Sequence, residues 1–212
     1  MSEPVYVDLS AMEQYIGEMD QIFTDFYEAQ SAINYAYNKV KPVWYDQISQ
    51  ATGMGLWDTG DKMERMSRYF SRMLRRLNEG YQMLDCNYGE NRAWDVQFHD
   101  KELEYSVNVE EEPMTRQIKG TTVEGIMRFE TELSDYIEKT GKNVRRVVAA
   151  YDGMRGYWDD SEYRRTGEKI EEFQASMNGN LKALDELLVW IEERRRQFQE
   201  SLATLSQRDG EM

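Results

Sequence analysis

The sequence has few of the residues that interrupt helices. Its 212 residues include three prolines and fourteen glycines, so long stretches carry no helix breaker. Because proline and glycine are the least favourable residues in a helix interior, their scarcity favours helices of more than average length. A long helix needs a partner that buries its apolar stripe, so we expect helices packed against one another.

The chain has one cysteine and one histidine. Cys86 cannot form an internal disulfide, and we interpret it as a free structural thiol. A single histidine, His99, excludes a ferritin-like di-metal site, histidine–cysteine zinc centres and a catalytic dyad that pairs serine or cysteine with a helix histidine. Acidic pairs such as Asp159-Asp160 are most often solvated. We therefore expect no cofactor, no metal and no enzyme activity.

Long apolar runs are also missing. No eighteen consecutive residues are apolar, and the first residues show no basic cluster followed by an apolar run, so we expect neither a membrane span nor a Sec signal. The 40 acidic residues exceed the 26 basic ones, for a net charge of −14. This charge repels the phosphates of nucleic acids and of anionic lipids, which makes both poor partners.

Apolar residues recur at alternating spacings of three and four from Leu9 to Val40, interrupted only at Gln30. This spacing predicts one long helix with a bundle-type seam, which Pro42 ends because proline disfavours helical geometry in the residue before it. The same spacing predicts three more helices. Their seams are marked by Met63, Met66, Phe70, Met73, Leu77, Tyr81 and Leu84; by Val123, Ile126, Leu133, Ile137, Val144, Val147, Tyr151 and Met154; and by Ile170, Phe173, Met177, Leu184, Leu187, Ile191, Phe198 and Leu205. Seam methionines are most often core residues, although a Met-rich surface can also bind partners.

The middle of the sequence changes period from helical to two. Alternation in 94–98 and again in 103–109 predicts a β-hairpin with His99 in its loop. We therefore predict a first helical hairpin over residues 6–86, a β-hairpin insert over 87–119, a second helical hairpin over 120–206 and a flexible tail over 207–212. The four seams can close into an intramolecular four-helix bundle, which predicts a monomer.

Each helical hairpin turns near a tryptophan, Trp44 in the first and Trp158 in the second, 114 residues apart. This pattern indicates an internal duplication, argued from helix length, seam and corner because overall identity between the halves is low. Gly53 and Gly55 weaken the helical signal after the first corner, so an irregular segment is possible there. Trp57-Asp58-Thr59-Gly60 is a competing position for that corner. Both corner tryptophans fit either a buried plug, which we favour, or a partner-recognition surface.

Two long antiparallel helices joined at a tryptophan resemble the WXG superfamily of type VII secretion substrates. The matching residues are Tyr157-Trp158-Asp159-Asp160, with Phe173 fifteen positions after Trp158, and Val43-Trp44-Tyr45-Asp46. Both corners read Trp-x-Asp where the superfamily has Trp-x-Gly. A carboxylate from Asp46 or Asp160 can still accept hydrogen bonds at the start of the following helix.

The superfamily's export signal, Tyr-x-x-x-Asp/Glu near the end of the second helix, is matched by Tyr81 and Asp85. Tyr81 is equally well explained as a seam residue. The resemblance implies a non-enzymatic type VII secretion substrate or targeting partner from a Gram-positive bacterium, exported without a cleaved signal, whose partners are secretion machinery or a secreted toxin. The alternative is a cytoplasmic adaptor or immunity-type protein that binds a basic partner.

Overall fold

The chain is mainly α-helical, as predicted. The computed structural model describes residues 6–7, 9–44, 46–88, 120–159 and 161–209. These residues form four α-helices: α1 (Leu9–Val40), α2 (Gln47–Tyr88), α3 (Gly120–Gly153) and α4 (Ser161–Asp209). The short 3-10 helix η1 (Met154–Gly156) and strand β2 (Trp158–Asp159) connect α3 to α4, and β2 pairs antiparallel with β1 (Tyr6–Val7).

The β-hairpin insert and the flexible tail stay predictions. The predicted β-hairpin insert falls within 89–119, outside the described residues. Helix α4 continues to Asp209 and so includes the first residues of the predicted flexible tail, 207–209. Its regular backbone hydrogen bonding carries on beyond the last seam residue, Leu205, without a glycine or proline to stop it before Gly210.

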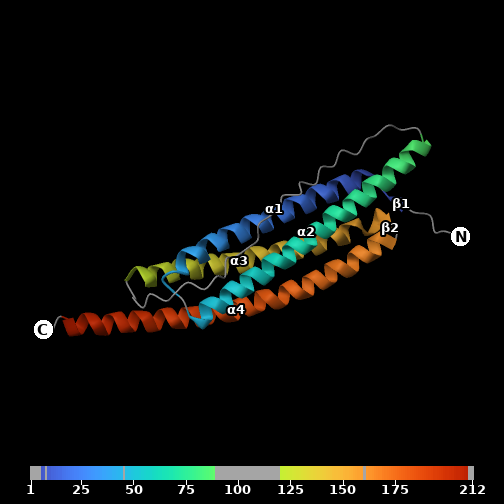
Figure 1. The fold of residues 1–212 in the computed structure, drawn as a ribbon. Helices are drawn as coiled ribbons and strands as arrows, with labels where there is room; N and C mark the ends of the chain where they lie inside the picture. Colours follow the sequence, from blue (N-terminus) through green and yellow to red (C-terminus); the bar gives the residue numbers. More distant parts are fainter. Residues whose placement is uncertain (1–5, 8, 45, 89–119, 160, 210–212) are drawn as a thin grey trace.

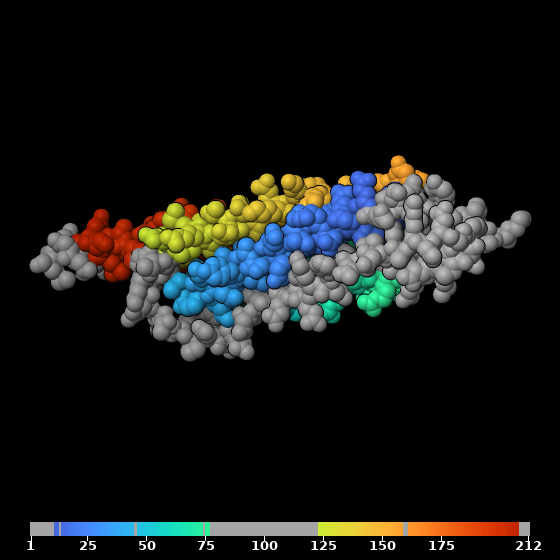
Figure 2. Space-filling view, turned by 90° about the horizontal axis from the view of Figure 1, so that it is seen from above, coloured from blue at the N-terminus to red at the C-terminus, as the bar shows by residue number. Residues whose placement is uncertain are grey.

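The four helices lie side by side as a helical bundle (Figure 1). Each of the pairs α1–α2, α3–α4, α1–α3 and α2–α4 runs antiparallel. The most extensive contacts of α1 are to α3, a helix of the other half, and those of α2 are to α4. Figure 2 shows α1 and α3 next to each other along one face of the molecule.

Helix α1 follows its seam closely. Every seam residue from Met12 to Val40 is buried, and Gln30, which interrupts the apolar pattern, is buried with them. The helix ends at Val40, two residues before Pro42, and the amides of Val43 and Trp44 donate to the Val40 carbonyl at 3.0 and 2.9 Å. Proline has no amide hydrogen, so the helical pattern stops and the chain turns.

Helix α2 starts earlier than the sequence indicated. The glycine-containing stretch after the first corner is helical from Gln47 onward, so the irregular segment that the glycines allowed does not form there. Trp57 lies inside the helix and is not a corner. Two of these glycines are sites of close packing. A Cβ at Gly53 would lie 2.8 Å from Cζ of Tyr37, and one at Gly55 would lie 2.9 Å from Cδ2 of Leu184.

One apolar core runs through the bundle and takes side chains from all four helices. Phe23 of α1 lies 5.5 Å from Phe70 of α2 between ring centroids, and Phe26 of α1 lies edge-on to Phe173 of α4 at 6.1 Å. Both contacts involve rings at predicted seam positions. The seams of both hairpins therefore close on a shared interior.

Candidate functional site

Besides Ala36 and Ala150, the two corners share five identical residues at the same spacing. Each member of the first set lies 114 positions before its counterpart: Tyr37, Trp44, Asp46, Thr52 and Gly53 match Tyr151, Trp158, Asp160, Thr166 and Gly167. Only the tryptophans and aspartates were predicted from the sequence as corner residues. The tyrosine, threonine and glycine were missed because they lie inside helices, where separated single matches look like ordinary seam residues.

The tyrosine and the glycine of each set join the two helices at each corner. The Tyr37 hydroxyl donates to the Ser49 carbonyl of α2 at 2.9 Å, and the Tyr151 hydroxyl donates to the Tyr163 carbonyl of α4 at 2.9 Å. Both tyrosine rings reach the helix backbone because a glycine stands beneath them, Gly53 in one corner and Gly167 in the other. The same tyrosine–glycine contact therefore joins consecutive helices at both corners, and we call it the clamp: Tyr37 with Gly53 and Tyr151 with Gly167.

The corner tryptophans are buried, at 1% exposure for Trp44 and 0% for Trp158. Trp44 packs on Phe129 of α3 with ring centroids 6.1 Å apart, and Trp158 packs on Tyr15 of α1 at 6.5 Å. Phe129 is the counterpart of Tyr15, so each corner of one half is covered by the same position of the other half. Neither indole is accessible to a partner, which agrees with the plug interpretation.

Asp46 caps the start of α2. Its Oδ1 accepts hydrogen bonds from the amides of Ile48 and Ser49, both at 2.9 Å, and its Oδ2 lies 3.1 Å from Nε of Arg194 on α4. The carboxylate thus satisfies two amides that a helix start leaves unpaired. Its counterpart Asp160 lies outside the described residues.

The predicted export motif lies within α2. Tyr81 and Asp85 are in the last two turns of this helix, and their side chains are outside the described part. Figure 1 shows this end of α2 reaching past the start of α1. Cys86 falls in the same turns and His99 in the segment 89–119.

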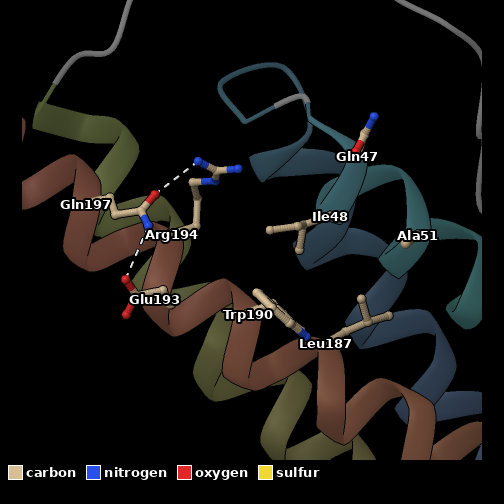
Figure 3. A pocket seen from close by; sticks show the side chains of 8 residues that line it. All are labelled: Gln47, Ile48, Ala51, Leu187, Trp190, Glu193, Arg194 and Gln197. Atoms are coloured by element: carbon tan, nitrogen blue, oxygen red, sulfur yellow. Dashed lines mark hydrogen bonds between the residues drawn. The ribbon is translucent and has the colours of Figure 1, made fainter.

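An open hollow of about 400 Å³ lies between the start of α2 and the later part of α4 (Figure 3). Ile48, Ala51, Leu187 and Trp190 supply its apolar side chains. Trp190 is 61% exposed, in contrast to the corner tryptophans. Around the rim, Arg194 donates to Gln197 at 3.0 Å and Gln197 donates to Glu193 at 3.2 Å. The hollow can accept an apolar side chain against the indole.

The equivalent position at the opposite end of the bundle is ionic. The counterparts of Trp190 and Ile48 are Arg76 and Glu162, whose charged groups lie 3.8 Å apart. The same backbone arrangement thus carries an ion pair at one end and an exposed indole at the other. Since the bundle does not require an aromatic residue there, the exposed Trp190 is a candidate partner contact.

The carboxylates with shifted pKa values belong to ion pairs. Partial burial acts to raise the pKa of Asp58, but hydrogen bonds from Lys62 and Asn180 outweigh it and lower the pKa. Burial raises the pKa of Glu130 although Arg195 donates to both of its oxygens at 2.9 Å. In the described part of the chain, no three metal-ligating side chains of the kinds His, Cys, Asp and Glu come together.

Comparison with protein-family models, with curated proteins and with solved structures finds no match to this chain. Across the described residues, no helix combines the length and the apolar character needed to traverse a bilayer.

Proposed function

We propose that this protein is a non-enzymatic interaction protein of type VII secretion, a substrate or a targeting partner built like two WXG-type hairpins in one chain. The observation that carries the proposal is the repeated corner: the same tyrosine, tryptophan, aspartate, threonine and glycine at a spacing of 114 residues. Two such hairpins pair antiparallel within the chain. Proteins of the WXG superfamily, which this chain resembles, are single helical hairpins that pair as two separate subunits into a four-helix bundle.

Two further features support the proposal. Tyr81 and Asp85 occupy the end of the second helix of the first hairpin, where the resemblance expects an export signal. The exposed Trp190 beside Ile48 and Ala51 supplies an apolar surface for secretion machinery or a secreted toxin. The net charge of −14 is compatible with a basic partner.

Export is tested by expressing the tagged protein in a Gram-positive host that has a type VII apparatus, with and without its secretion ATPase. We expect the wild-type protein in the medium only when the ATPase is present, while a cytosolic marker stays in the cells. Tyr81→Ala is expected to abolish this release, and thermal unfolding of the variant separates loss of the export signal from loss of a seam contact. Tyr35→Ala is the matched control, because Tyr35 is 64% exposed on α1 and lies far from the export motif in sequence.

Retention of the wild-type protein in both strains would reject the export function. The remaining reading would then be a cytoplasmic adaptor or immunity-type protein for a basic partner. Capture experiments with wild type and Trp190→Ala would show whether that partner uses the hollow on α4.

A further inference from the structure

The two halves of the molecule are related position by position. We call residues 6–88 the first half and 120–209 the second half. The contacts Trp44–Phe129 and Tyr15–Trp158 are exchanged by the 114-residue offset, so the interface of α1 with α3 has an approximate two-fold axis. This symmetry predicts the contacts of a pair of identical halves. In such a pair, each interface residue would face the counterpart of the residue that it contacts in the present structure.

The first contact that breaks this symmetry is a buried polar network. The Tyr136 hydroxyl of α3 donates to Oε1 of Gln30 on α1, and Nε2 of Gln30 donates to Oδ1 of Asn34 at 2.9 Å and to the Leu56 carbonyl at 3.2 Å. Gln30 is 1% exposed and Tyr136 is 2% exposed. Their counterparts, Val144 and Ile22, are buried and apolar.

Pairing two identical halves would therefore break this network. In a pair of first halves, the amide oxygen of Gln30 would face Ile22 instead of a hydroxyl. In a pair of second halves, the Tyr136 hydroxyl would face Val144. A buried polar group that loses its partner is costly, and each such pair contains the mismatch twice.

The second contact is an ion pair between the halves. Arg146 of α3 donates to Asp25 of α1 and also to Oδ1 of Asn143 at 3.1 Å. The counterpart of Asp25 is Lys139 and the counterpart of Arg146 is Ala32. A pair of second halves would place Arg146 opposite Lys139, and a pair of first halves would leave Asp25 opposite Ala32. Like charges across an interface select against that pairing.

A third polar contact between the halves joins α2 and α4. Asn180 of α4 donates to Asp58 of α2 at 2.7 Å and accepts from Lys62 at 3.1 Å. The counterparts of Asn180 and Asp58 are Met66 and Glu172. Two first halves would place Asp58 opposite a methionine. Two second halves would place Asn180 opposite Glu172, whose carboxylate already pairs with Lys169 of its own helix at 2.6 Å.

We infer that these three contacts make the interface heterotypic: a first half binds a second half and rejects another copy of itself. The apolar seams supply the affinity and are apolar in both halves at most matched positions, with exceptions such as Phe26 and Phe173, whose counterparts are Thr140 and Thr59. The contacts Gln30–Tyr136, Asp25–Arg146 and Asp58–Asn180 supply the selectivity. The inference is independent of the proposed role in secretion. It rests on residues that differ between otherwise matching positions.

The test cuts the chain between the two halves and measures which halves associate after refolding. A protease site is introduced between residues 89 and 119, and the purified full chain is cleaved, unfolded in urea and refolded. Ala29→Cys in a Cys86→Ser background reports on the pairing of two first halves. Asp25 faces Arg146, the counterpart of Ala32, so the two-fold axis passes close to residue 29. An oxidised first-half dimer forms only if two α1 helices pair.

We expect the wild-type interface to refold as a 1:1 complex of first and second halves with almost no oxidised first-half dimer. A variant with Gln30→Val, Asn34→Val, Tyr136→Ile and Arg146→Ala removes two of the three selective contacts. Because the loss of one buried hydrogen bond shifts an equilibrium by about tenfold, its fraction of first-half dimer should be at least about tenfold larger. Equal fractions in both proteins, or halves that separate on cleavage, would overturn the inference.

A second variant covers the case in which the fourfold substitution does not fold. Asp25→Arg places two arginines together at a half-exposed position and is expected to weaken the complex of the cleaved halves by about tenfold. Asp25→Arg combined with Arg146→Asp reverses the ion pair and should restore the affinity. If the double variant binds no better than the single one, the ion pair does not select the partner.

Discussion

The hydroxyl of Tyr15 lies in the core of the bundle, where it has no hydrogen-bond partner among the described residues. Burial is the main reason why the pKa of Tyr15 is raised well above 10. Electrostatic repulsion from Tyr151, Tyr163, Tyr69 and Glu18 raises this pKa further. The ring itself is useful, because it packs on Trp158. The buried, unpaired hydroxyl therefore lowers the stability of the folded protein, and the packing of the ring does not depend on it.

We predict that Tyr15→Phe raises the free energy of unfolding at pH 7 by about 1 kcal/mol, since it removes an unpaired buried polar group. The difference from wild type should widen as the pH rises above 10. There the unfolded tyrosine ionises while the folded one stays protonated, so the raised pKa contributes stability below pH 10 that is lost with increasing pH. Urea unfolding followed by circular dichroism at pH 7 and above pH 10 measures both effects. A constant difference across this range would contradict the pH argument.

At the scale of single elements, the glycines of α2 and α4 have opposite consequences depending on what lies above them. A Cβ at Gly167 would meet the ring of Tyr151, with Cζ at 2.9 Å, whereas a Cβ at Gly179, in the same helix, has nothing within 4 Å. The first glycine is required by packing between helices. The second only weakens its helix.

We therefore predict that Gly179→Ala stabilises the protein by about 0.5–1 kcal/mol, the usual difference in helix propensity. Gly167→Ala and Gly53→Ala should each destabilise it by about 1–3 kcal/mol, because the tyrosine ring must leave its site. Thermal and urea unfolding of the three variants provide the comparison. Stabilisation by Gly167→Ala would show that the clamp can relax freely.

At the scale of the whole molecule, each corner is completed by the other half. Trp44 of the first half packs on Phe129 of the second, and Trp158 of the second half packs on Tyr15 of the first. A loss at one corner therefore weakens both halves together. We therefore expect the bundle to unfold as one cooperative unit, although its sequence is a repeat of two hairpins.

We predict a single unfolding transition, with coincident curves from circular dichroism and tryptophan fluorescence. Trp44→Ala should lower the free energy of unfolding by about 3–5 kcal/mol and shift the whole transition. Trp190→Ala is the matched control and should change it by less than about 0.5 kcal/mol, because Trp190 is 61% exposed. Two separate transitions in the Trp44→Ala variant would mean that the halves fold independently.

Local chemistry was sufficient to predict several features of the fold. The end of α1 follows from Pro42, which has no amide hydrogen, and the buried face of α1 follows from its apolar spacing. The start of α2 was left open by the sequence, because glycine has a low helix propensity. The ring of Tyr37 and the side chain of Leu184, which pack against Gly53 and Gly55, explain why this helix contains glycine there. The assignment to type VII secretion and the export role of Tyr81 and Asp85 stay predictions.

The sequence by itself determined that the chain forms long helices, where the described turns fall and which face of each helix is apolar. These properties depend on neighbours within a few residues, so periodicity and proline placement encode them. Only the tertiary structure decided that α1 lies chiefly against α3, that Gln30 finds Tyr136 and that the two corners are matched clamps. Apolar seams of similar spacing fit many partners, and the choice among them depends on polar contacts between residues about a hundred positions apart.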